Sequence, residues 1–361
     1  VMASFTAYAL RDVPNSLGPL NELVAGVWSD FRNLVDAGLG DSRPEIVHLK
    51  LYLAQFGYLN LTSATSSSGG GLGNLTQLFD SHTLAALQLY QQSFNLSVTG
   101  KLDVPTLLRL MTPRCGREDV ADGIPLMLHS TPSYGHVVGH YAFFPSKPTW
   151  PTSRRNLTYA FSSSNETGHV ELNDRRRAFA AAFAEWAAIV PVNFTEVDVY
   201  SQADIKIEFV SFSHGDGEPF DGVLGVLAHA FSPTDGRFHL DNSEFWHLFS
   251  FGSAGTLPQQ IDLQSVVTHE IGHLLGLAHS PVENAIMYPS IAPGQVKQQD
   301  DIQGAQALYG ANPNYDPNSP LPGVPPALGD LSNHANPLIL PSLSLFLCFL
   351  SILSLVLFYT I

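Results

Sequence analysis

The sequence predicts an α+β protein in which a small helical unit precedes a domain of mixed strands and helices. Apolar residues recur at helical spacing in two early segments, 44–57 and 80–94, and again in a longer segment that ends before Pro191. Between residues 204 and 210, apolar and polar residues alternate strictly, which is typical of a strand with one buried face. Strands that are followed by helices in the second part favour the α+β class.

Capping residues and helix breakers bound the individual elements. Asp80 or Ser81 is predicted to begin the helix over 80–94, and Asp103 to begin a third early helix, because their side chains can accept hydrogen bonds from unpaired backbone amides. In the second part, a strand over 157–161 precedes the long helix, which carries Phe179, Phe183, Trp186 and Ile189. Further helices are predicted over 261–275 and over 300–309, and the last of them ends at Gly310.

The elements divide the chain into five regions. We expect residues 1–20 to be a signal-peptide remnant with a lead-in, 21–140 the helical unit with its connection, and 141–310 the α+β domain. Residues 311–335 are rich in Pro and Asn and are predicted to be a linker, and 336–361 form a hydrophobic end. A length of 361 residues with 45% hydrophobic residues is sufficient for two folded units.

The charge balance narrows the classes of partner. The net charge of −15, from 32 acidic against 17 basic residues, disfavours a surface that follows nucleic-acid phosphates. It is compatible with cation binding or with simple solubility. We therefore expect no nucleic-acid partner, and we expect a monomer.

Several features predict passage through the secretory pathway. The opening residues are apolar and contain an Ala-x-Ala pattern at residues 7–9, as at the end of a signal peptide. The chain also holds six Asn-x-Ser/Thr glycosylation sequons, at Asn60, Asn74, Asn95, Asn156, Asn165 and Asn193. We therefore expect an extracellular protein.

The uncharged segment 338–361 is long enough to enter a bilayer as a helix. A polar stretch of small residues, 329–336, precedes it, which is the layout of a signal that is exchanged for a glycolipid (GPI) anchor. A retained membrane span is the alternative, but no basic residues follow the segment to hold a cytoplasmic end. A buried core helix is a third interpretation. We expect the anchor signal, and hence a location on the outer face of the plasma membrane.

The segment 268–280, THEIGHLLGLAHS, has the spacing of a catalytic metal site. His269 and His273 lie four residues apart, so both imidazoles leave the same helix face and can bind one ion. Gly276 can adopt the left-handed conformation that ends the helix, which lets the chain return and supply His279 as a third ligand. Three ligands leave one position of a zinc ion open for the water of a hydrolytic reaction, and Glu270 is the predicted general base.

This HExxHxxGxxH pattern, followed by AIMYP at 285–289, resembles the metzincins, and with the segments below it resembles the matrix metalloproteinases (matrixins), most closely the plant GPI-anchored members. The resemblance implies a metzincin-type catalytic domain, a twisted five-stranded sheet with three helices, preceded by a three-helix prodomain. It implies that Met287 forms a floor under the zinc and that Tyr288 and Pro289 line a substrate pocket. Such an enzyme cleaves proteins or peptides before apolar residues.

A second cluster of metal-ligand residues lies in the segment 214–246. Three histidines and one carboxylate can close a tetrahedral zinc shell with no position for water, which makes this zinc structural: His214, Asp216, His229 and His239. Asp221, Asp241 and Glu244 offer the hard oxygen ligands that calcium prefers, and the family adds backbone carbonyls near Gly222 and Gly225. The resemblance also implies a second calcium at Asp204, which the short 232–238 loop makes doubtful.

Cys115, in PRCGREDV, has no cysteine to pair with except Cys348 in the hydrophobic end. Because a thiolate is a strong zinc ligand, Cys115 can occupy the open position of the catalytic zinc and keep the enzyme latent. The segment resembles the matrixin cysteine switch, in which Arg114 and Asp119 form a salt bridge. The family usually has proline in place of Glu118, and Arg117 is also atypical, so we expect looser latency.

These features together predict a secreted zinc endopeptidase, made as a latent precursor and released by cleavage near residues 139–145. The resemblance implies that the new amino terminus then pairs with Asp300. An alternative is a non-catalytic surface protein that keeps the zinc fold for binding partners, although such proteins usually lose the glutamate or a histidine. A third hypothesis is that the helical unit is a stable cell-wall-binding module and that the protease is incidental.

Overall fold

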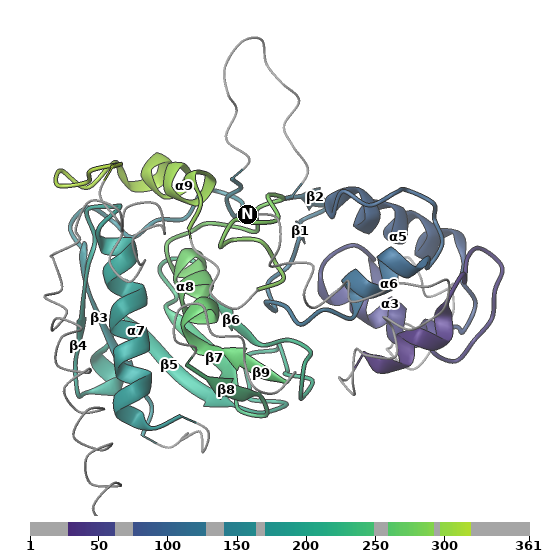
Figure 1. Cartoon of the computed structure of the whole chain (residues 1–361), viewed down its shortest axis with the longest axis horizontal. Helices are drawn as coiled ribbons and strands as arrows, with labels where there is room; N and C mark the ends of the chain where they lie inside the picture. Colours follow the sequence, from purple (N-terminus) through teal and green to yellow (C-terminus); the bar gives the residue numbers. More distant parts are fainter. Residues whose placement is uncertain are drawn as a thin grey trace, which may run out of the picture. The chain divides into compact units, whose positions relative to one another are not determined.

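The computed structural model describes residues 28–61, 75–127, 141–163, 170–248, 259–291 and 297–318 (Figure 1). Within these ranges, no helix is long and apolar enough to cross a membrane. The predicted signal-peptide remnant and the hydrophobic end over 338–361 lie outside the described residues, as does most of the linker over 311–335.

In the first unit, the described residues form three α-helices and a 3-10 helix: η1 (Ser29–Leu34), α3 (Ile46–Gln55), α5 (Ser81–Ser93) and α6 (Val104–Leu110). Asp80 and Asp103 cap α5 and α6 as predicted, accepting hydrogen bonds from the backbone amides of Thr83 and Thr106 at 2.8 and 3.0 Å. The apolar faces of the helices meet in one core, which includes Leu49, Leu53, Leu87, Tyr90 and Leu107. The three helices lie close together in Figure 1.

After α6 the chain passes through the Cys115 segment and forms a short antiparallel hairpin. Strands β1 (Val120–Ala121) and β2 (Ile124–Pro125) pair directly. The turn between them places Asp122 and Gly123 at positive φ.

The second unit is built on one five-stranded sheet: β3 (Asn156–Phe161), β4 (Asn193–Glu196), β5 (Ile205–Val210), β6 (Ala228–Ala230) and β7 (Arg237–Asp241). The strand order is β4-β3-β5-β7-β6, and only β6 runs antiparallel to its neighbour. The alternation predicted for residues 204–210 appears as a buried and half-buried alternation along β5. Strand β6 lies at the edge of the sheet, so one side of it pairs with no other strand of the sheet and can bind an extended segment.

Three helices accompany the sheet among the described residues: α7 (Leu172–Ala187), α8 (Leu263–Leu274) and α9 (Gln299–Tyr309). Helix α7 runs beside α8 (Figure 1), and the indole of Trp186 in α7 donates a 2.8 Å hydrogen bond to the carbonyl of Thr268 in α8. A 3-10 turn, η3 (Tyr200–Gln202), and a parallel pair, β8 (Phe245–His247) and β9 (Gln260–Asp262), complete the unit. The predicted α+β class and five-stranded sheet are confirmed.

Two predicted helix ends differ from the structure. Ile189 lies beyond the end of α7, although its side chain is fully buried in the core. Helix α8 begins at Leu263 and not at 261, because residues 260–262 form β9 and Asp262 caps the helix by accepting from the amide of Ser265 at 3.3 Å.

Candidate active-site cleft and metal centres

Helix α8 and the turn that follows it bring three histidines together. His269 and His273 leave α8 one turn apart, and Gly276 then reverses the chain at a φ of 99°. A Cβ atom at this position would lie 2.2 Å from the carbonyl oxygen of Pro148, so the turn requires glycine. The ligand atoms of His269, His273, His279 and Cys115 all lie within 4.8 Å of one another.

The three imidazoles are oriented through their Nδ1 atoms, which leaves each Nε2 directed at the cluster. Nδ1 of His269 lies 2.6 Å from the carbonyl of Ile286, and Nδ1 of His273 lies 2.8 Å from the carbonyl of Leu277. Since a carbonyl only accepts, both Nδ1 atoms carry the proton and both Nε2 atoms present a lone pair. Hydrogen-bond partners of this kind fix ligand histidines in metal sites.

The distances within this cluster suit a tetrahedral zinc ion. Nε2 of His269 and Nε2 of His273 are 3.1 Å apart, and Sγ of Cys115 is 3.3 Å from Nε2 of His273. Zinc bonds of about 2.0–2.3 Å at tetrahedral angles place the ligand atoms roughly 3.3–3.6 Å apart. Nε2 of His279 is buried without a hydrogen-bond partner, as expected for an atom that binds a metal.

Burial also sets the protonation states that a cation requires. It lowers the pKa of all three histidines, so the rings are neutral and able to bind metal at neutral pH. Burial and the nearby Glu270 carboxylate raise the pKa of the Cys115 thiol well above its ordinary value. A thiolate at this position therefore depends on a cation, and the residues present fit zinc.

Glu270 is fully buried beside Cys115, and neither of its carboxylate oxygens makes a hydrogen bond of normal geometry. Burial raises its pKa to about 8. Two residues further along the helix, a Cβ atom at Gly272 would lie 2.2 Å from the sulfur of Met287, so the close approach of Met287 to α8 depends on this glycine. The structure thus places Met287 directly against the helix that carries the ligands.

The second cluster forms at the edge of the sheet, between β6, β7 and the loop before them. The Oδ2 atom of Asp216 lies 2.8 Å from a ring nitrogen of each of the three histidines, His214, His229 and His239. Burial lowers the pKa of His229, and it lowers that of His239 to about 4. Four ligand atoms from neutral imidazoles and a carboxylate again suit a tetrahedral ion.

Asp221, Asp241 and Glu244 form a third group of ligand candidates. Burial raises the pKa of Asp221 to about 7 and that of Glu244 to about 8, and the neighbouring carboxylates add to both shifts. One oxygen of Asp221 and one of Glu244 are buried without a hydrogen-bond partner. Buried carboxylates that face one another are stable in the ionised form only with a cation, and oxygen ligands of this kind suit calcium.

Among the described residues, Asp204 belongs to neither of the two metal-ligand clusters. One carboxylate oxygen of Asp204 accepts from Arg154, and the other accepts from the amide and hydroxyl of Thr158 at 2.8 and 3.0 Å. The carboxylate is therefore engaged with β3 and with an arginine, which leaves the doubtful second calcium site without geometric support.

The Cys115 segment lies in the cleft between the edge of the sheet and the chain after Met287. Arg114 pairs with the segment before β6, donating to the carbonyl of Gly225 at 3.0 Å and accepting from Leu227 at 2.9 Å. The amide of Gly116 donates to Ala228 at 2.8 Å, and the amide of Cys115 donates to the carbonyl of Pro289 at 2.9 Å. The segment thus occupies the position of an extended peptide on the open edge of the sheet.

Arg114 and Asp119 form the ion pair that the sequence predicted, with N–O distances of 2.7 and 2.9 Å. Both side chains are buried, and the guanidinium of Arg114 stacks 3.6 Å from the ring centre of Phe56. Asp119 also lies 2.8 Å from Nδ1 of His279. Although burial opposes it, Arg114 and His279 lower the pKa of Asp119 to about 2, so this residue stays ionised.

Two contacts of this segment were not predicted from the sequence. The first is that of Asp119 with His279, in which the helical unit supplies the hydrogen-bond partner of a metal-site histidine. The second joins Arg117 to Glu218, with N–O distances of 2.7 and 2.9 Å. The only sequence signal for either was the atypical character of Arg117 within the motif.

The pocket residues after α8 face the helical unit. Tyr288 is buried, its ring lies edge-on to Phe94 at 5.9 Å, and the guanidinium of Arg109 lies 5.1 Å from its centre. Asp300 accepts a 2.7 Å hydrogen bond from the hydroxyl of Ser280. Of the six sequons, those at Asn60, Asn95, Asn156 and Asn193 are exposed, and Asn74 and Asn165 lie outside the described residues.

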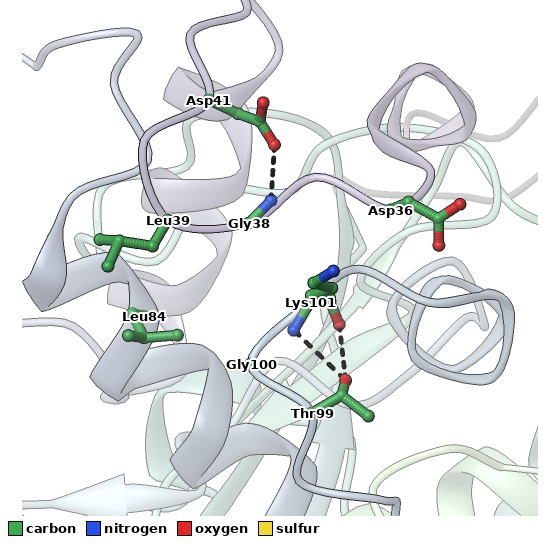
Figure 2. Close-up of a pocket in the computed structure, with 8 residues that line it drawn as sticks. All are labelled: Asp36, Gly38, Leu39, Asp41, Leu84, Thr99, Gly100 and Lys101. Carbon is green, nitrogen blue, oxygen red and sulfur yellow. Dashed lines mark hydrogen bonds between the residues drawn. The ribbon is translucent and has the colours of Figure 1, made fainter.

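A separate hollow of about 320 Å³ lies within the helical unit, and Figure 2 shows the residues around it. Lys101 and Thr99 lie on one side, and Asp41 and Leu39 on the other. None of the metal-cluster residues lines this hollow.

Comparisons with known proteins agree with this geometry. Residues 149–310 match the Matrixin family, and residues 42–110 match the Putative peptidoglycan binding domain. The chain is 42% identical over 310 residues to Metalloendoproteinase 2-MMP of Arabidopsis thaliana, covering 82% of this chain and 79% of the relative. It is 44% identical to Metalloendoproteinase 5-MMP of the same plant, over 84% and 82%. It is 34% identical to human Matrix metalloproteinase-20, over 75% of this chain and 52% of the relative.

A convergent three-histidine cluster with a buried glutamate and an edge strand beside it is the arrangement that zinc peptidases use. The chain belongs to the matrixin family and is a zinc-dependent metalloendopeptidase.

Proposed function

We propose that the chain is made as a latent precursor in which Cys115 closes the catalytic zinc site from the helical unit. The observation that carries this proposal is the position of the Cys115 sulfur, 3.3 Å from Nε2 of His273 within the cluster of four ligand atoms. The same segment fills the cleft along β6. Latency therefore has two parts, a blocked metal position and a blocked substrate groove.

The active enzyme would use the same groove for its substrate. Bound zinc supplies a Lewis acid that polarises a carbonyl and lowers the pKa of water. Residues 225–230 would hold the substrate backbone through the amides and carbonyls that now bind residues 114–116. Glu270, next to His269 on α8, would accept the proton of the attacking water and pass it to the leaving amine. The buried ring of Tyr288 and the adjacent Pro289 favour an apolar residue just after the cut.

The other ion sites would be structural. His214, Asp216, His229 and His239 would hold a second zinc with no position for water, and Asp221, Asp241 and Glu244 would hold calcium with carbonyls near Gly222 and Gly225. Both sites combine residues of β6 and β7 (His229, His239 and Asp241) with residues of the loops that flank these strands. Their proposed role is to fix the edge strand on which the substrate pairs.

The departures of Arg117 and Glu118 from the family motif predict looser latency. The contacts of Arg117 instead favour a firmly held switch segment. Arg117 donates two hydrogen bonds to Glu218 of the catalytic domain, and its side chain is 12% exposed. Release of the precursor would follow cleavage between the switch and residue 145, and the new amino terminus would pair with Asp300. Secretion, glycan attachment at the exposed sequons and a glycolipid anchor remain part of this proposal, supported by the sequence patterns above.

A direct test compares the purified full chain before and after proteolytic removal of the helical unit, using quenched-fluorescence peptides. Cleavage is expected only after removal. A Glu270→Gln variant should keep its zinc and lose activity by about 10²–10⁴-fold, because it lacks a general base. A Glu283→Gln variant, which changes an exposed carboxylate, should keep full activity. Equal turnover by Glu270→Gln and wild type would rule out Glu270 as the general base, whereas no cleavage by the activated wild type would favour the non-catalytic binding protein.

A further inference from the structure

The Arg117 side chain occupies a defined site on the catalytic domain. Its guanidinium makes two hydrogen bonds to the Glu218 carboxylate, at 2.7 and 2.9 Å. It also lies 5.0 Å from the ring centre of Phe231 and 5.5 Å from that of Phe144. An acidic group with two hydrogen-bond acceptors and two aromatic rings is a favourable environment for a guanidinium or ammonium group.

The site is fixed to the rigid part of the catalytic domain. Phe231 directly follows β6, and its ring is held on another side by Arg237, whose guanidinium lies 3.8 Å from the ring centre. The backbone amide of Glu218 donates a 2.9 Å hydrogen bond to Asp216, one of the second-cluster residues. Glu218 and Phe231 therefore each have contacts within the catalytic domain that do not depend on the helical unit.

The position of this site along the groove follows from the pairing of the switch segment. Arg114 lies beside Val226, and Gly116 donates to Ala228, so the segment runs parallel to the edge strand and carries Arg117 towards the Phe231 end. Tyr288 lies on the other side of Cys115, near the rings that surround Arg114. The acidic site and the apolar pocket therefore flank the catalytic cluster on opposite sides.

We infer that Glu218 and Phe231 form a specificity site for a basic residue of the substrate, which Arg117 fills in the latent precursor. This inference rests on the proposed endopeptidase function and names a substrate class for it. Because the apolar residue follows the cut on the Tyr288 side, the basic residue precedes the cut by two or three positions. The preferred substrate is a peptide with Arg or Lys there and an apolar residue just after the scissile bond.

The test uses the full chain, activated by proteolytic removal of the helical unit, and peptides that differ only two or three residues before the cut. Arg is compared with citrulline, which keeps the shape and loses the charge, and with Glu. The Glu218 side chain is 37% exposed, so the expected preference in kcat/KM for Arg over citrulline is about fivefold, the equivalent of roughly 1 kcal/mol. Glu should be a poorer substrate residue than citrulline.

Two matched variants separate a local site from the general negative charge of the protein. Glu218→Gln should bring the ratio of Arg to citrulline close to one. Glu283→Gln removes the same charge from a carboxylate that also pairs with an arginine of the helical unit, Arg109, and should keep the wild-type ratio. The comparison of Arg with citrulline in the wild type needs no variant and therefore does not depend on how Glu218→Gln folds.

The outcomes distinguish this inference from the function on which it rests. Efficient cleavage of all peptides with a ratio near one would overturn the specificity site and leave the endopeptidase intact, with Glu218 serving only to hold Arg117. A preference that persists in Glu218→Gln would assign it to other residues. The absence of cleavage of every peptide after activation would overturn both proposals.

Discussion

The two clusters of histidines differ in where their fourth ligand comes from. In the cluster at the edge of the sheet, all four ligand residues belong to the catalytic domain, within 26 positions from His214 to His239. In the cluster on α8, three ligands lie within residues 269–279, but the fourth, Cys115, comes from the helical unit. A shell closed by one domain is permanent, whereas a shell closed by a removable segment can be opened. On the function proposed above, similar ligand chemistry would thus serve a structural site in one place and a switch in the other.

The largest expected effect, on the activity of the intact precursor, comes from replacing Cys115, the ligand that the helical unit supplies. In Cys115→Ser, the hydroxyl is a weak zinc ligand, so the intact chain should cleave peptides at a rate on the order of 100-fold above the wild-type precursor. The measurement is the initial rate of peptide cleavage without any activating protease. Cys348→Ser, which replaces the only other cysteine of the sequence, is the control and should remain latent. A latent Cys115→Ser protein would mean that occupation of the groove alone is sufficient for inhibition.

The next effect concerns Asp119, which connects the switch to the cluster. Asp119→Asn leaves the buried Arg114 without its counter-ion and weakens the orientation of His279. Breaking a buried ion pair costs about 3 kcal/mol or more, so we expect a lower unfolding temperature of the helical unit and faster self-activation of the precursor. The exposed Asp122, three residues further along, provides the matched control Asp122→Asn. Identical activation rates for the two variants would contradict the assigned role.

A smaller effect, on thermal stability, should distinguish the proposed calcium site formed by Asp221, Asp241 and Glu244 from the two proposed zinc sites. The folded-state pKa of Asp221, about 7, and that of Glu244, about 8, lie above their ordinary values. Without a cation, the folded protein therefore holds protons that the unfolded chain has released, and stability falls as the pH rises from about 4 to about 8. Calcium should offset this loss, raising Tm by about 5 °C at pH 8 and by less at pH 6.

The measurement is a set of melting curves of zinc-saturated protein with and without calcium at the two pH values. Asp221→Asn should abolish most of the calcium increment at pH 8. A calcium effect that is larger at pH 6 than at pH 8 would contradict the assignment of these carboxylates as its ligands.

The sequence was sufficient for the residues whose relation is local. His269, Glu270 and His273 share one helix, so helical periodicity alone places them, and the alternation along β5 likewise predicts its buried face. Gly276 could be interpreted because only a left-handed residue ends α8 in the required direction. Local rules of this kind determine most of the ligand set.

The remaining features depend on contacts between distant parts of the chain. The Asp119–His279 contact joins residues 160 positions apart, and the pairing of Arg117 with Glu218 spans 101 positions. No periodicity signals such pairs, because they arise only when the switch segment lies in the cleft. The end of α7 before Ile189 was missed for a similar reason, since the side chain of Ile189 is buried by the core and not by the helix.

The most direct test of the central claim is zinc X-ray absorption spectroscopy on the intact precursor and on the activated enzyme. If Cys115 binds the catalytic zinc and the second cluster binds the proposed structural zinc, the precursor should show a sulfur shell at about 2.3 Å with an average of about half a sulfur per zinc. This shell should disappear after removal of the helical unit and in Cys115→Ser. A precursor spectrum with only nitrogen and oxygen ligands would contradict the account.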